Sequence, residues 1–152
     1  MIIPELIIFS VAASPIVELR GAIPLAINGY GLPVWSAYLF AVAGNLVPIL
    51  SILVMGFIST WLSRRSRVCK MFIEWVFART RQRHEQKFIK YQSFALILLV
   101  AIPLPFTGAW TGSLAAFVFG IPFKKAFPLI AIGVIIAGVI VTLISLGFVH
   151  VF

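Results

Sequence analysis

The chain has 152 residues, of which 62% are hydrophobic and 11% are charged, and its mean hydropathy is +1.13. These values exclude an ordinary soluble domain and predict a single integral membrane domain. The formal net charge of +8 does not indicate a nucleic-acid-binding protein, because nine of the twelve basic residues fall between residues 64 and 90.

The first apolar stretch is too short to cross a bilayer. Residues 2–13 are interrupted early by Pro4 and Glu5, and they lead into the segment PIVELRGAIPLAI, residues 15–27, which carries Glu18 and Arg20. A transmembrane helix needs about 20 apolar residues, and proline breaks a helix. The sequence therefore predicts a re-entrant helical hairpin that enters and leaves on the outer side of the membrane.

Residues 33–62 predict the first full span. These 30 residues form a helix of roughly 45 Å, which exceeds the hydrocarbon core of about 30 Å. Tilt or a kink at Pro48 accommodates the difference. Trp35 and Tyr38 at one end and Trp61 at the other are placed to lie at the two interfaces.

The basic segment that follows predicts a cytoplasmic linker, residues 63–92, because loops rich in Lys and Arg stay in the cytoplasm. Part of it has the apolar spacing of a helix that lies on the membrane surface, with anionic lipid headgroups as its partners. The polar remainder, RTRQRHEQKFIKYQ, is expected to be solvated. The apolar positions of this helix are Val68, Met71, Phe72, Trp75 and Val76.

The last third of the chain repeats the pattern of short and long apolar segments. Residues 93–102 reach about half of the bilayer before PLPFTGAWTG breaks the helix, so they predict a second re-entrant hairpin. Residues 126–149 form a second full span of 24 residues. A hairpin returns Lys124 and Lys125 to the cytoplasm and leaves both termini outside.

An internal repeat relates the two parts of the chain. GLPVWSAYLFAVAG matches GIPFKKAFPLIAIG at an offset of 89 residues. The expected fold is an all-α integral membrane protein with an inverted repeat, each half being a re-entrant hairpin followed by a transmembrane helix. Half 1 covers residues 1–62 and half 2 covers residues 93–152. The matched pairs are Gly31 and Gly120, Pro33 and Pro122, Ala37 and Ala126, and Gly44 and Gly133.

The two charges of the first hairpin are the main candidates for a functional site. Each would cost about 2.5–3.5 kcal/mol at the centre of a lipid-facing helix, so they are expected to face protein or water. Arg20 presents a planar set of donors suited to phosphate or carboxylate. A carboxylate such as Glu18 in a partly apolar site takes up and releases protons near neutral pH and can couple a gradient to transport. The alternative is a structural ion pair that only fastens the hairpin.

The second hairpin offers uncharged polar groups. Thr107, Trp110 and Thr111 are expected to complete a substrate site with Arg20, while Asn28 and Asn45 are weaker candidates. No His, Cys or carboxylate group has metal-ligand spacing, and no nucleophile and base have chemical spacing, so the sequence predicts no metal, no cofactor and no enzyme. The residues expected to shape the hairpins are Pro15, Gly21, Pro24, Pro103, Pro105, Gly108 and Gly112.

The segments ELRGAIP and PLPFTGAWTG, with the basic linker between them, resemble the small multidrug export protein family and, through it, the DedA superfamily. The resemblance covers essentially the whole chain. It implies two opposed re-entrant hairpins and proton-linked movement of anionic lipid carriers such as polyprenyl phosphates. The second hairpin departs from the larger DedA relatives because it carries no charge.

Three functions remain open from the sequence. The first is a proton-coupled transporter or lipid translocator in the cytoplasmic membrane, in which Arg20 binds an anionic amphiphile and Glu18 carries protons. The second is a small multidrug or cation exporter in which Glu18 is the counter-charge. The third is a membrane scaffold without transport. The small size of the chain favours a homodimer.

Overall fold

The computed structural model describes residues 3–65, 67–81, 86–103 and 107–151, and this part of the chain is all helical. Two stretches, Val34–Ser59 and Phe123–Gly147, are long and apolar enough to cross a membrane. The helices are α1 (Ile3–Ala13), α2 (Glu18–Pro24), the π-helix η1 (Leu25–Gly29), α3 (Val34–Leu46), the 3-10 helix η2 (Val47–Leu50), α4 (Ser51–Arg65), α5 (Arg67–Arg81), α6 (Gln86–Ala101), α7 (Ala109–Val118) and α8 (Phe123–Val151).

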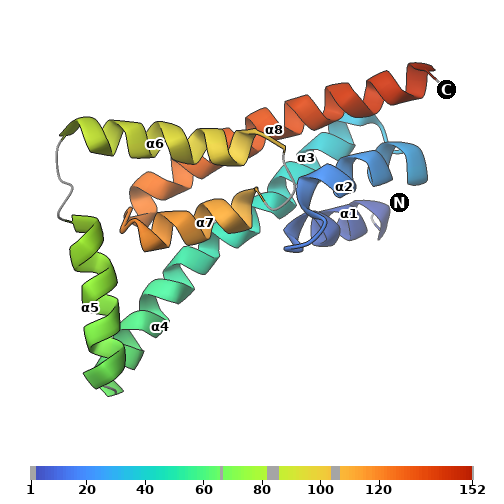
Figure 1. Cartoon of the computed structure of the whole chain (residues 1–152). Helices are drawn as coiled ribbons and strands as arrows, with labels where there is room; N and C mark the ends of the chain where they lie inside the picture. Colours follow the sequence, from blue (N-terminus) through green and yellow to red (C-terminus); the bar gives the residue numbers. More distant parts are fainter. Residues whose placement is uncertain (1–2, 66, 82–85, 104–106, 152) are drawn as a thin grey trace.

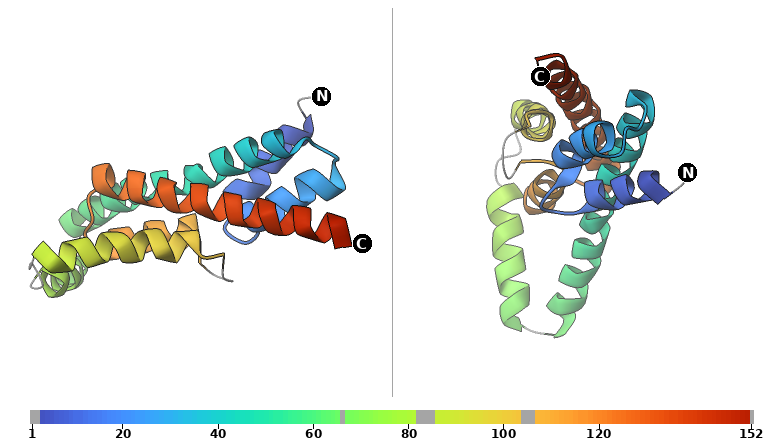
Figure 2. Two further views of the ribbon diagram at one scale, coloured as in Figure 1. Left: turned by 90° about the horizontal axis from the view of Figure 1, so that it is seen from above. Right: turned by 90° about the vertical axis from the view of Figure 1, so that its right-hand side faces the viewer.

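The chain folds into two helical pairs, each followed by a long helix. Figure 1 shows α1 paired with α2 and α6 paired with α7, with the turns of the two pairs meeting near the middle of the molecule. The long helix α3–η2–α4 runs in the opposite direction to α8 in the views of Figures 1 and 2. Both termini lie at one end of the molecule, and α5 lies at the other end.

The first long helix is interrupted where the sequence predicts a kink. Pro48 has no backbone N–H and cannot continue the α-helical ladder, and it lies in the 3-10 turn Val47–Leu50 between α3 and α4. The backbone N–H of Val47 donates to the carbonyl of Gly44 instead. This turn allows the helix to continue to Arg65, three residues beyond the predicted end.

A glycine on each long helix lets the first helix of its own pair approach closely. A Cβ at Gly44 of α3 would overlap the carbonyl oxygen of Phe9 and lie 2.9 Å from the Cβ of Ala12, both on α1. A Cβ at Gly133 of α8 would lie 2.7 Å from the Cβ of Val100 on α6. Gly44 and Gly133 are one of the pairs matched at an offset of 89 residues. The two matched glycines therefore also have the same role in packing, as the point where a long helix contacts the first helix of its pair.

The turn before each long helix is also repeated at the offset of 89 residues. Gly31 and Gly120 have φ angles of 63° and 68°, in the left-handed region that side chains rarely adopt. Each is followed two residues later by a proline that precedes a helix start, Pro33 before α3 and Pro122 before α8. Glycine and proline therefore build the same left-handed turn twice.

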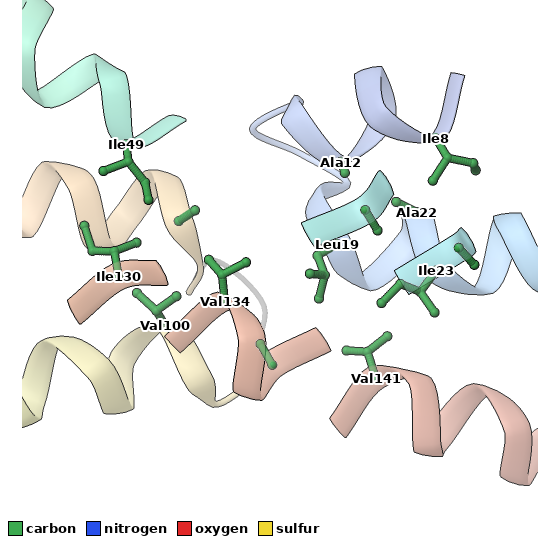
Figure 3. Packing of buried hydrophobic residues seen from close by; sticks show 14 of the residues in the cluster. Ile8, Ala12, Leu19, Ala22, Ile23, Ile49, Val100, Ile130, Val134 and Val141 are labelled. Carbon is green, nitrogen blue, oxygen red and sulfur yellow. The ribbon is translucent and has the colours of Figure 1, made fainter. Parts of the chain in front are cut away.

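The buried core extends along the middle of the molecule between the two pairs. Its largest fully buried side chains include Ile8, Leu19 and Ile23 from the first pair and Ile130 and Val134 from α8. Figure 3 shows Ile130 and Val134 in one group with Ile49 and Val100, and Leu19 and Ile23 in another group near Val141 of α8. Because this packing fixes the inner ends of the helices, it positions the polar residues at the turns.

The linker differs from its prediction in one respect. The amphipathic segment forms the helix α5 as expected, but α6 begins at Gln86 rather than at residue 93. Residues 86–92 are therefore helical, and the exposed side chain of Tyr91 agrees with the expectation that this polar segment is solvated. Gln and Lys are good helix formers, and a helix that leaves an apolar layer keeps its hydrogen bonds by continuing into water.

Candidate functional site

Two side chains at and just before the start of α7 donate hydrogen bonds to the carbonyl ends of α1 and α6, the first helices of the two pairs. The indole N–H of Trp110 donates to the carbonyl of Ala13, the last residue of α1, over 3.0 Å. The hydroxyl of Thr107 donates to the carbonyl of Ile102, directly after α6, over 2.9 Å. Carbonyls at helix ends have no intrahelical partner, so both bonds satisfy groups that need one. Ala13 and Ile102 are themselves 89 residues apart.

Glu18 connects the first pair to the start of α7. Its side chain is 10% exposed, and the backbone N–H of Trp110 donates to its carboxylate. The carboxylate lies so close to Gly108, the N-cap residue of α7, that a Cβ there would overlap it. Glu18 is also the one non-glycine residue with a positive φ, 50°, in the described part of the chain. A carboxylate at a helix N-terminus is favoured by the helix dipole, which offsets part of the cost of burying it.

Arg20 lies beside Glu18 and reaches the second pair. Its Nη2 atom donates to the hydroxyl oxygen of Thr107 over 3.1 Å and lies 3.9 Å from Oε2 of Glu18. A quarter of the side chain is exposed. Thr107 therefore accepts a hydrogen bond from Arg20 and donates one to the carbonyl of Ile102. The position of the guanidinium is fixed by this contact, while part of the Arg20 side chain stays exposed.

A pocket of about 530 Å³ is lined in part by Arg20. The described residues that line it include Arg20 but not Glu18. Its other walls are mainly apolar, and the hydroxyl of Ser145 already donates to the carbonyl of Val141 over 2.8 Å. The site therefore offers one cation next to apolar surface. The remaining lining residues are Pro24, Asn28, Pro103, Val141, Ile144 and Ser145.

The structure brings four sequence candidates together at the turns of the two pairs: Glu18, Arg20, Thr107 and Trp110. Three of them, Glu18, Thr107 and Trp110, are absent from the described pocket wall. Thr111, on α7, is half-buried and is not among the residues that line the pocket either.

The residues expected to shape the hairpins have several positions. Pro15 is exposed in the turn after α1, Pro24 ends α2, and Pro103 lines the pocket. Glycine at position 21 makes room for a side chain of the preceding turn, and Gly112 approaches a side chain of α6. Pro105 lies outside the described residues.

Sequence reasoning missed the contribution of α8. Val141, Ile144 and Ser145 have the spacing i, i+3, i+4 and share one helix face, where a serine among aliphatic residues is the available signal. Asn28, a weaker candidate from the sequence, lies in η1 and is part of the pocket wall. In the described residues, no group of three His, Cys, Asp or Glu side chains could hold a metal ion.

The family comparison covers most of this arrangement. No curated protein and no solved structure matches the chain. A family model matches residues 18–140, which begin at Glu18 and include α2–α7 and the first part of α8. The chain belongs to the family described as "Putative small multi-drug export protein".

Proposed function

We propose that this protein is a membrane transporter that moves anionic amphiphiles across the bilayer through the pocket beside Arg20. The observation that carries the proposal is that Arg20, and not Glu18, faces this pocket. Guanidinium keeps its charge when water is removed and binds phosphate or carboxylate with two parallel hydrogen bonds. Val141 and Ile144 provide apolar surface for a hydrocarbon chain, so a polyprenyl phosphate is one suitable substrate.

The proposed arrangement in the membrane is an inverted repeat of two re-entrant hairpins. At about 1.5 Å per residue, α1 with 11 residues and α7 with 10 are each roughly half as long as the hydrocarbon core is thick. The opposite directions of α3–α4 and α8, the glycine packing and the paired left-handed turns support this arrangement. In it, the linker is cytoplasmic and both termini are outside.

Glu18 is the proposed proton carrier. Its carboxylate interacts with the Trp110 N–H and lies 3.9 Å from Arg20. Protonation removes the negative charge that attracts both groups, so it weakens the hold on the guanidinium and favours binding of an anion. One proton and one anion then enter the site together, which keeps its net charge constant.

Export of cationic drugs is the second candidate, because the family description names multidrug export. In that mechanism Glu18 is the counter-charge. The carboxylate must then leave its position against Gly108 and turn to the pocket. The two mechanisms differ in the charge that contacts the substrate.

The experiment is a thermal stability measurement on the detergent-purified protein, with farnesyl phosphate or tetraphenylphosphonium added. A ligand at a hundredfold excess over its Kd stabilises the fold by about 2.7 kcal/mol. At about 3 °C per kcal/mol this raises the Tm by roughly 8 °C. The variants are Arg20→Ala, Arg20→Lys and Glu18→Gln. Arg65→Ala, at the exposed end of α4, is the matched control for loss of a positive charge.

Stabilisation by farnesyl phosphate that is lost in Arg20→Ala, reduced in Arg20→Lys and kept in Arg65→Ala supports the anion site. Stabilisation by tetraphenylphosphonium that is lost in Glu18→Gln favours the cation exporter. If neither compound has an effect that depends on these residues, both mechanisms are wrong and a scaffold without transport becomes the better explanation.

A further inference from the structure

The helix α5 has an apolar face whose side chains are mostly exposed in the described part of the protein. Val68, Met71, Phe72 and Trp75 are 73%, 69%, 64% and 57% exposed. Their spacing of i, i+3, i+4 and i+7 puts them on one face of the helix. The rings of Phe72 and Trp75 stack with their centroids 6.2 Å apart, which makes this face a continuous patch.

The position of α5 is that of a helix at a membrane surface. The apolar stretch of the first long helix ends at Ser59, and α4 then carries the chain to Arg65. Trp61 and Arg65 form a cation–π pair there, with the guanidinium carbon 6.0 Å from the ring centroid. Since α5 starts two residues after α4 ends, it begins where the chain leaves the hydrocarbon layer. Figure 1 shows α5 at the end of the molecule where α6 and α8 start, with its axis steeply inclined to that of α6.

The charges around the patch indicate the composition of that surface. Arg67 and Lys70 are exposed on α5, and Lys124 and Lys125 are exposed at the start of α8. Figure 1 shows that α5 and the start of α8 lie at the same end of the molecule. Lys70 has an exposed ion pair with Glu74 over 3.7 Å, which is weak in water and leaves the excess of positive charge at this end. Basic residues next to a membrane attract anionic lipid headgroups.

We propose that α5 lies in the headgroup layer of an anionic lipid bilayer, with its apolar face in the acyl boundary and its basic residues on the lipid phosphates. The occupant of the patch is therefore the bilayer in which the protein itself is inserted. This inference is independent of what the pocket beside Arg20 binds, because the described residues that line that pocket include none from α5.

The test measures the depth of single spin labels on the full chain in vesicles. Cys69 is the single cysteine of the chain, so Cys69→Ala gives a background into which Phe72→Cys or Lys70→Cys is introduced. The protein is reconstituted in phosphatidylcholine alone, or in equal parts of phosphatidylcholine and phosphatidylglycerol. Electron paramagnetic resonance then gives the accessibility of each label to oxygen, which concentrates in the acyl layer, and to a water-soluble nickel chelate.

In the anionic vesicles, we expect an oxygen-to-nickel ratio several-fold higher at position 72 than at position 70. In phosphatidylcholine alone, or in Arg67→Glu, the ratio at position 72 falls towards the ratio at position 70. Equal ratios at the two positions in anionic vesicles overturn the proposal. A ratio at position 72 that does not change with lipid charge also overturns it. A label at position 72 that is inaccessible to both reagents overturns it as well, because protein then covers the patch.

Discussion

Replacing Gly44 by alanine tests the close contact between α1 and α3. The added Cβ would overlap the Phe9 carbonyl oxygen and lie 2.9 Å from the Cβ of Ala12, and a backbone atom cannot rotate away as a side-chain end can. Such overpacking costs about 1–3 kcal/mol. The higher helix propensity of alanine returns about 1 kcal/mol, so the net destabilisation is up to about 2 kcal/mol.

The matched control is Gly56→Ala on α4, where nothing lies within 4 Å of the added Cβ. The change in the free energy of unfolding of this control comes from helix propensity alone. The difference between the two variants is therefore the overpacking cost of about 1–3 kcal/mol. Thermal unfolding in detergent should place the Tm of Gly44→Ala roughly 3–9 °C below that of Gly56→Ala, at about 3 °C per kcal/mol. Gly133→Ala should behave like Gly44→Ala, because Val100 Cβ lies 2.7 Å from the added atom.

Equal Tm values for Gly44→Ala and Gly56→Ala would show that α1 does not pack on α3 as described. A loss at Gly44 without a loss at Gly133 would contradict the shared packing of the two halves and, with it, the internal repeat.

Substitutions at Trp110 and Gly31 test the turns. Trp110→Phe keeps an aromatic ring but removes the donor to the Ala13 carbonyl, so it should lower the free energy of unfolding by about 1 kcal/mol. The control Trp35→Phe, at an exposed position, should leave the Tm unchanged. Gly31→Ala should cost about 1–2 kcal/mol through its φ of 63° alone, since its Cβ meets nothing within 4 Å. Gly31→Asn should recover much of that cost because asparagine tolerates this conformation, and equal Tm values for the two Gly31 variants would refute the left-handed turn.

The helices that follow from length and hydropathy could be predicted from the sequence. Residues 33–62 and 126–149 are long apolar runs, and a proline in the first run gives the position of its irregular turn. The amphipathic linker helix follows from an apolar period of 3.6 residues. The start of α6 at Gln86 was missed because polar residues that prolong a helix into water have no periodic signal.

The candidate site could be predicted only in part. Charges in an apolar stretch identify Glu18 and Arg20, because such charges are rare and costly in membranes. Their different environments depend on contacts with residues about 90 positions away, such as Gly108 against the carboxylate and Thr107 on the guanidinium. The wall supplied by α8 depends on how that helix is rotated, which the composition of a uniformly apolar span does not specify.

The hydrogen bonds that join Glu18 and Arg20 to the second pair have a consequence for the biogenesis of the protein. Arg20 and its acceptor Thr107 are separated by 87 residues, so at ribosomal rates of about 5–20 residues per second the partner is made roughly 4–17 s later. During that interval the nascent first half contains Glu18 without the helix terminus that it caps. A chain that stops in the linker therefore keeps Arg20 beside Glu18 but lacks both the α7 terminus for the carboxylate and the hydroxyl acceptor for the guanidinium.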